Sequence, residues 1–172
     1  TPFQWTHVAA VFTGSTCYIF QNGVQTASGG PSTWPVTGSS DTVKIGTRND
    51  AANYFTGYIS NARIVIGTAL YTAAFTPPTT PLLSVANMKL LAGQANTILD
   101  RSIYNATLTA TGTPQISSSN PFTAIYQAGT QYYSGSFNGS SDYLSVATSL
   151  LLDMGSSDFT MEGWAYLNGN QS

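Results

Sequence analysis

The sequence predicts an all-β protein built from two antiparallel sheets. Short segments of alternating apolar and polar residues recur along the chain, each bounded by Gly, Asn, Asp, Ser or Pro. Strong helix formers are scarce, since the chain has one Glu and two Lys. Hydrophobic residues make up 42% of the 172 residues, which is enough to build a core. We therefore expect an antiparallel sandwich with at most a turn or two of helix.

The first half of the chain contains five predicted strands. Asn22-Gly23 stands between the second and the third and is a strong hairpin signal, because both residues accept the positive φ of a type I′ turn. In the long fifth strand we expect a bend or bulge at Gly57 or Asn61. The five strands are Trp5–Phe12, Thr16–Gln21, Val24–Thr26, Thr42–Ile45 and Phe55–Ile66.

A proline-rich stretch at 76–82 follows these strands and predicts a linker or an extended edge segment. Just before it, Gly67–Phe75 has the residues for one short helical turn. The strands predicted in the second half are Met88–Leu91, Thr107–Thr111, Ser134–Val146 and Phe159–Tyr166. The alternation predicts that the following side chains are largely buried: Trp5, Val8, Ile19, Ile45, Ile64, Leu144 and Trp164.

The composition argues against several classes of protein. Charged residues make up 7% of the chain and its net charge is −2, so the basic surface that nucleic-acid binding requires is absent. No run approaches the ~20 apolar residues of a membrane span. The first residues show neither a basic nor an apolar signal region, so no signal peptide is expected. The single cysteine, Cys17, permits no internal disulfide and no cysteine-based metal cluster.

Two blocks of sequence carry a resemblance to a known family. The first block comprises Trp5–Val11, Tyr18–Gly23, Val43–Gly46 and Phe55–Ile64. The second comprises Met88–Leu91, Asp100–Ser102, Phe137–Leu144 and Asp158–Tyr166. The first block resembles the second half of a concanavalin A-like, laminin-G-like jelly-roll domain, and the second block resembles the first half. The resemblance implies an antiparallel jelly-roll sandwich.

The two blocks stand in the reverse of the family order, and this predicts the domain layout. Residues 1–83 would be the C-terminal half of one sandwich, ending in the proline-rich joint, and residues 84–172 the N-terminal half of the next. A window across two tandem copies and a circular permutant both fit, and we favour the window because both ends fall inside strand-like sequence. Neither half would bury its sheet face alone, so another copy or chain would complete the sandwich.

The sequence does not predict a catalytic site. His7 is the only histidine and lies in an alternating strand, where the resembled family has a structural histidine. We therefore expect a packed side chain with its hydrogen bonds satisfied, rather than a member of a triad. Asp158 and Glu162 form the tightest carboxylate pair, but the Glu-x-Asp-x-x-Glu pattern of the related glucanases is absent. We expect no hydrolase activity.

A glycan site needs fixed planar hydrogen-bonding groups and an aromatic face. Such groups are concentrated in one loop, and we predict as ligands Arg48, Asn49, Asp50 and Tyr54, with Trp34 from a second loop as a stacking face. A solvated hairpin tip and an interface tryptophan are the alternatives. The resemblance also implies a calcium ion, with Asp50, Asn49, Asp142 and Asp100 as candidate ligands and ordinary turn residues as the alternative.

These observations and the resemblance predict a non-enzymatic glycan-binding or adhesion module of a multi-domain virion or extracellular surface protein. A purely structural assembly module of a fibre, filament or capsid surface, without a ligand, is the second interpretation, and a glycoside hydrolase is a weaker one. The expected partners are surface glycans, other copies of the chain and neighbouring domains, with no nucleic acid and no membrane span. The expected location is the virion surface or the extracellular space.

Overall fold

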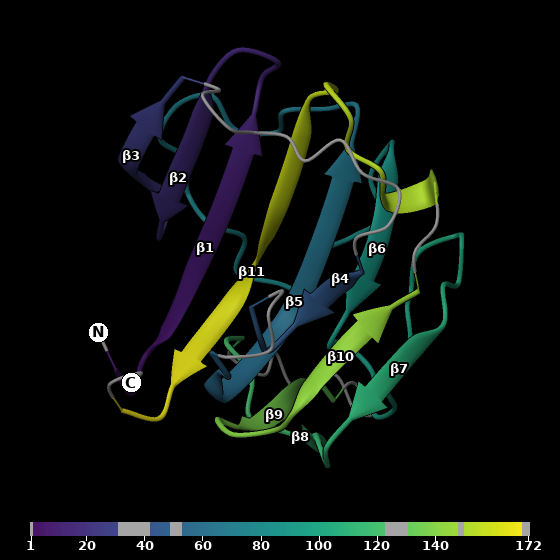
Figure 1. Cartoon of the computed structure of the whole chain (residues 1–172). Coiled ribbons are helices and arrows are strands. Elements are labelled where there is room, and N and C mark those ends of the chain that lie inside the picture. Colours follow the sequence, from purple (N-terminus) through teal and green to yellow (C-terminus); the bar gives the residue numbers. More distant parts are fainter. Residues whose placement is uncertain (1, 31–41, 49–52, 123–130, 148–149, 170–172) are drawn as a thin grey trace.

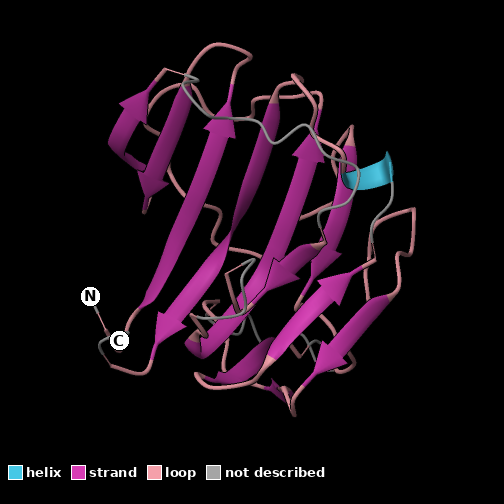
Figure 2. Cartoon of the chain, in the orientation of Figure 1, coloured by secondary structure: helices cyan, strands magenta, loops and turns pink. Residues whose placement is uncertain are grey.

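The computed structural model describes residues 2–30, 42–48, 53–122, 131–147 and 150–169. Within these ranges the ordered structure is almost entirely β-strand, with one 3₁₀ turn at Leu150–Leu152 (Figure 2). All strand pairs between these elements are antiparallel. The predicted all-β fold class is confirmed. None of the described residues belongs to a helix that is long and apolar enough to span a membrane.

Eight strands form one sheet, here called the large sheet (Figure 1). They are β1 (Trp5–Phe12), β2 (Cys17–Gln21), β3 (Val24–Gly29), β5 (Thr56–Ile66), β6 (Met88–Ala92), β8 (Gln115–Ser117), β9 (Ser134–Asn138) and β11 (Phe159–Leu167). Their order is β3-β2-β1-β11-β5-β9-β8, and β6 also pairs with β5. The small sheet has the order β4-β10-β7 and contains β4 (Val43–Ile45), β10 (Tyr143–Val146) and β7 (Leu108–Thr111).

Strand β11 is central to the architecture because it joins the two halves of the chain. It pairs with every residue of β1, from Trp5 opposite Tyr166 to Phe12 opposite Phe159, and with β5 on its other side. In the small sheet, β4 of the first half pairs with β10 of the second. The two halves thus share both sheets of one sandwich. That residues 1–83 and 84–172 derive from two successive tandem copies stays a prediction.

The large sheet has two faces with different coverings. The small sheet packs on the inner face, where the core contains Ile64, Leu90, Val146 and Leu152. The outer face is covered by the long segment 67–87, which connects β5 to β6 and is called the crossover below. Its Tyr71 and Phe75 pack on a cluster of β1 and β2 side chains that comprises Ala9, Val11 and Phe20.

The proline-rich stretch at 76–82 is packed against the large sheet rather than forming a loose linker. Leu82 is buried, its N–H donates to Oδ1 of Asn61 at 2.8 Å, and its carbonyl accepts from Nε2 of Gln94 at 2.8 Å. Side chains thus take the backbone hydrogen bonds that a neighbouring strand would otherwise supply. The expected helical turn in Gly67–Phe75 was wrong, because this segment contains only bends and irregular backbone.

Two local predictions are confirmed by the backbone angles. Asn22 and Gly23 have φ of 50° and 76°, as a type I′ turn requires. Asn61 has φ of 57° and lies where the pairing of β5 with β11 shifts between Glu162 and Trp164, so the predicted bulge is at Asn61. The bulge gives Asn61 the orientation in which it holds Leu82 of the crossover.

The predicted core is confirmed in part. Ile64, Leu144 and Trp164 are buried, whereas Trp5 and Ile45 are half-buried. The prediction was wrong for Val8 and Ile19, which remain 42% and 38% exposed. Both side chains lie on the inner face of the large sheet, as the alternation predicts. The described part of the small sheet does not cover them.

The Asn22-Gly23 turn provides a test of the crossover packing. A Cβ at Gly23 would lie 1.8 Å from the carbonyl oxygen of Phe75, whereas one at Gly14, with nearly the same φ of 75°, would lie 3.4 Å from its nearest neighbour. Gly14→Ala carries only backbone strain and should lower the free energy of unfolding by ~1 kcal/mol. Gly23→Ala adds a backbone clash and should cost about 3 kcal/mol, measured by urea denaturation. Equal losses would show that the crossover does not pack against this turn.

Candidate functional site

A buried cluster of polar side chains lies around Glu162, in the middle of β11. Oε1 of Glu162 accepts hydrogen bonds from Nε and Nη2 of Arg63 at 3.0 and 2.6 Å. Oε2 accepts from the Tyr71 hydroxyl at 2.9 Å and from Nε2 of His7 at 3.1 Å. The side chain of Glu162 has no exposed surface. These four residues are called the Glu162 cluster below.

Strand register brings the Glu162 cluster together. Since β11 lies between β1 and β5, Glu162 has Arg63 directly opposite on one side and Ala9 on the other. His7 stands two residues before Ala9, on the same face of the sheet and within diagonal reach. Tyr71 comes from the crossover, whose backbone is also held by Arg63 through a hydrogen bond from Nη1 to the carbonyl of Leu83 at 2.9 Å.

His7 is packed among aromatic rings as the sequence predicted. Its ring centroid lies 4.6 Å from that of Trp164 and 5.6 Å from that of Phe75, both edge-on. Because a carboxylate only accepts hydrogen bonds, Nε2 of His7 carries a hydrogen and donates it to Glu162. The other ring nitrogen is Nδ1. Nδ1 is buried and has no hydrogen-bond partner among the described residues, so the expectation that the hydrogen bonds of His7 are satisfied is met only at Nε2.

The surroundings of Glu162 favour its charged form. Burial alone would raise the pKa of the Glu162 carboxyl, but the hydrogen bond from His7, the charge and hydrogen bonds of Arg63 and the hydrogen bond from Tyr71 outweigh burial and hold that pKa below its ordinary value. Burial and the neighbouring carboxylate raise the pKa of Tyr71 far above its ordinary value. The cluster therefore contains an ionised carboxylate and a neutral phenol at neutral pH.

This geometry stabilises the fold and offers little to a substrate. Both carboxylate oxygens of Glu162 already accept hydrogen bonds from the protein. A general acid or base must lie within hydrogen-bond reach of the substrate proton that it transfers, and the buried carboxylate does not offer this. The sequence analysis singled out His7 and Glu162 separately. It predicted neither their contact nor that Arg63 and Tyr71 donate hydrogen bonds to Glu162. One signal could have indicated the cluster: Glu162 is the only charged residue in its predicted strand, and a charge that is buried in a sheet needs a partner of opposite charge.

Part of the predicted glycan loop lies at the end of a hairpin next to the small sheet. Thr47 and Tyr54 form an isolated bridge, and the N–H of Arg48 donates to the carbonyl of Asn53 at 3.0 Å. Arg48 is exposed and Tyr54 is half-buried. Three predicted ligands lie outside the described residues: Trp34, Asn49 and Asp50.

The structure adds two neighbours to this loop that the sequence did not indicate. The ring centroid of Tyr54 lies 6.4 Å from that of Tyr143, and Nζ of Lys44 lies 5.4 Å above the Tyr143 ring. They meet because β4, which carries Lys44, pairs with β10, which begins at Tyr143. Arg48, Tyr54, Tyr143 and Lys44 are called the rim cluster below.

The sequence analysis also did not predict a hollow of mixed polar and apolar lining, here called the Arg101 hollow. It has a volume of about 250 Å³ and lies where the crossover meets the chain after β6 and the residues before β9. Planar amide and guanidinium groups and two phenol rings line it, from Gln94, Arg101, Gln131, Tyr132 and Tyr133. These are the kinds of group that hydrogen-bond and stack on a polar ligand.

Two of the predicted calcium ligands have structural contacts. The carboxylate of Asp100 accepts hydrogen bonds from the N–H groups of Leu91, Ser102 and Ala106. That of Asp142 accepts from the N–H groups of Thr113 and Asn138. In the described part of the chain no group of three or more His, Cys, Asp or Glu side chains is placed to hold a metal. A calcium site at Asp50 and Asn49 stays a prediction.

The ion pair in the Glu162 cluster gives a stability prediction. Glu162→Gln keeps the shape of the side chain but leaves the Arg63 charge buried without a counter-charge, so the free energy of unfolding should fall by about 3 kcal/mol. Adding Arg63→Met should recover part of this loss, because no unpaired charge then remains. The control Asp153→Asn removes an exposed carboxylate and should change stability by less than about 0.5 kcal/mol. Equal effects of Glu162→Gln and Asp153→Asn in urea denaturation would contradict this account.

The lowered pKa of Glu162 gives a prediction for pH. A carboxyl with a lowered pKa in the folded state stabilises the fold above the unfolded-state value of about 4.3 and loses that contribution as the pH falls through the folded-state value. The difference in unfolding free energy between the parent and Glu162→Gln should therefore be constant near neutral pH and shrink below about pH 4.3. Denaturation curves across a pH series measure it, and a difference that does not change in acid would refute the assignment.

Comparison with known proteins agrees with the fold. Residues 1–71 match a family model described as the concanavalin A-like lectin/glucanases superfamily, a laminin-G type. No curated protein and no solved structure matches the chain. The matched residues include β1 to β5 and, at their end, Tyr71 of the Glu162 cluster. The resemblance to the concanavalin A-like superfamily is thus confirmed over residues 1–71, and the antiparallel sandwich is consistent with a jelly roll of this superfamily.

Proposed function

We propose that the chain is a non-enzymatic glycan-binding module of a larger surface protein. The match of residues 1–71 to a superfamily of lectins and glucanases carries this proposal, since it supports a lectin-like or adhesion module in general. The rim cluster residues Arg48 and Tyr54 lie within the matched part. A place on a virion or in the extracellular space, with tandem copies of the domain, belongs to the proposal.

The rim cluster has the chemistry that a sugar requires. Tyr54 and Tyr143 are half-buried aromatic rings side by side, and Arg48 is an exposed planar donor. A pyranose presents C–H faces that pack on aromatic rings and hydroxyls that hydrogen-bond to such donors. Trp34, Asn49 and Asp50 remain predicted ligands of the same site. The hollow next to Arg101 is the alternative location, because amide, guanidinium and phenol groups also line it.

The absence of catalysis is part of the proposal. The only His and the only Glu of the chain hydrogen-bond to each other in the interior, and an arginine holds the carboxylate. Retaining and inverting glycosidases ordinarily need two carboxyl groups that flank a substrate bond. The Glu162 cluster is closed to a substrate, which supports a binding module over a hydrolase.

The glycan site is tested by measuring how the parent chain and its Tyr→Ala variants bind to an array of glycans. The chain is coupled to beads so that weak sites bind multivalently. Loss of one stacking ring is worth about 0.5–1.5 kcal/mol per site, so Tyr54→Ala and Tyr143→Ala should weaken binding about two- to tenfold. As a control, Tyr104→Ala removes an exposed tyrosine outside the rim cluster that also contacts a lysine, and it should leave binding unchanged.

The controls distinguish the possible results of this test. Loss of binding in Arg101→Ala, with binding by Tyr54→Ala unaffected, would place the site in the Arg101 hollow. Binding that a chelator abolishes would support the calcium prediction at Asp50 and Asn49. If the parent binds no glycan on the array, the proposed function is wrong, and the structural assembly module takes its place.

A further inference from the structure

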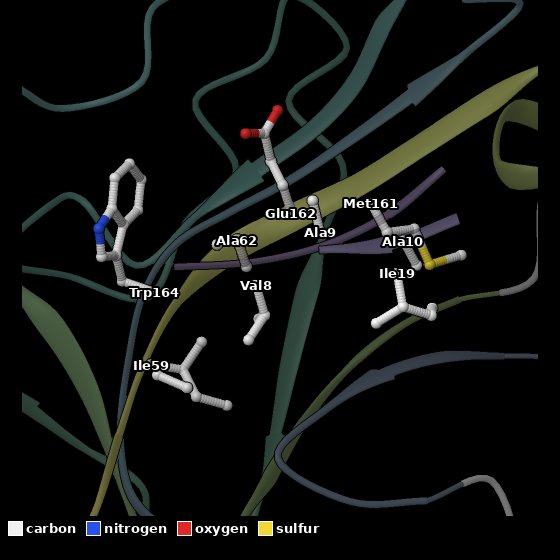
Figure 3. Close-up of a pocket in the computed structure, with 11 residues that line it drawn as sticks. Val8, Ala9, Ala10, Ile19, Ile59, Ala62, Met161, Glu162 and Trp164 are labelled. Carbon is white, nitrogen blue, oxygen red and sulfur yellow. The ribbon is translucent and has the colours of Figure 1, made fainter. Parts of the chain in front are cut away.

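The hollow shown in Figure 3 and the Arg101 hollow differ in the chemistry of their walls. In the first, Val8 and Met161 lie on one side of the strands, whereas Glu162 extends from the other side. Among the described residues that face this hollow, no side chain carries a nitrogen or an oxygen. The Arg101 hollow combines a guanidinium, amides and phenol rings, so it is the one suited to a polar ligand.

The buried wall of the Arg101 hollow is held by hydrogen bonds within the protein. Oδ1 of Asn61, at the bulge of β5, accepts from the N–H of Leu82 at 2.8 Å and from Nε2 of Gln94. The same nitrogen of Gln94 also donates to the carbonyl of Leu82 at 2.8 Å. Asn61 and Leu82 are both buried. This wall is preorganised, so a ligand would not have to order it.

The rest of the hollow presents polar groups that the protein does not use. The guanidinium of Arg101 and the hydroxyls of Tyr132 and Tyr133 make no hydrogen bond within the described part of the chain. The Tyr132 ring packs edge-on against Phe122, with 5.6 Å between the ring centroids. Arg101 is exposed, whereas both tyrosines are half-buried. An accessible cation therefore lies beside aromatic rings that are held in place.

Arg101 also lacks a counter-charge. The adjacent carboxylate, Asp100, is 2% exposed and accepts hydrogen bonds from the N–H groups of Leu91, Ser102 and Ala106. No Asp or Glu of the described ranges lines the hollow, and none of them forms an ion pair with Arg101. The hollow therefore favours an anionic group, and a guanidinium binds a carboxylate through two parallel hydrogen bonds.

We propose that the Arg101 hollow binds a uronic acid, a sugar whose carboxylate pairs with Arg101 and whose ring packs on Tyr132 and Tyr133. The volume of about 250 Å³ is below the about 300–1,000 Å³ of most small-molecule sites, so a single sugar ring is the size that fits. The C–H face of a pyranose packs on phenol rings. The inference rests on the proposed function for the choice of a sugar, but it uses no residue of the rim cluster.

The test is an NMR titration of the ¹⁵N-labelled chain with sodium glucuronate, read at the amide signals of Gln94, Arg101 and Tyr133. Glucose lacks the carboxylate and sodium acetate lacks the ring, so glucuronate should bind at least about tenfold more tightly than either. Arg101→Gln should reduce the affinity for glucuronate to that for glucose, and Arg101→Lys should have an intermediate effect because it keeps the charge without the planar fork. Lys89→Gln is the matched control, since it removes the same charge outside the hollow, and should leave the affinity unchanged.

Each outcome decides the matter, once circular dichroism shows that the variants are folded. Equal affinities for glucuronate and glucose would overturn the role of Arg101, and equal affinities for glucuronate and acetate would overturn the sugar. Glucuronate binding that Arg48→Gln weakens and Arg101→Gln does not would place the ligand on the rim cluster and also overturn the inference. A parent that binds glycans through Tyr54 but does not bind glucuronate would contradict this inference alone and leave the proposed function intact.

Discussion

The buried ion pair between Arg63 and Glu162 is the constraint on which the rest of the structure depends. Buried charges must be paired, and the partner of Glu162 on β11 lies 99 residues earlier on β5. This pairing fixes β11 beside β5, and the second carboxylate oxygen reaches His7 on β1 and Tyr71 on the crossover. One carboxylate thus connects three neighbouring strands and the segment that covers them, and unites the two halves of the chain in one sheet.

The two faces of the large sheet follow from this arrangement. The crossover shields the charged cluster on the outer face, and its backbone is held by the side chains of Asn61 and Arg63. On the inner face, the small sheet packs on Ile64 of β5 and Leu90 of β6. Glycan binding is proposed at the edge of the small sheet, away from the buried Glu162 cluster.

Local features could be predicted from the sequence, and long-range contacts could not. Alternation located most of the strands, but it did not predict β8 and it predicted Ser134–Val146 as one strand, which the structure divides into β9 and β10 of different sheets. Asn22-Gly23 predicted the turn, and the bulge is at Asn61, one of the two positions expected for it, because such backbone angles are local properties. The contacts of Glu162 with Arg63 and Tyr71, and of Tyr54 with Tyr143, depend on strand order and register, which alternation does not specify. Alternation also shows that Val8 is on an apolar face, but not whether another layer covers that face.

Hydrogen exchange of the folded chain at neutral pH tests the central role of the Glu162 pairing most directly. The account predicts that the amides of β1, β5 and β11 are the slowest to exchange and open together, and that Glu162→Gln accelerates all three strands. Fast exchange in β11 while β1 and β5 stay protected would contradict it, because β11 would then not be the strand that joins them.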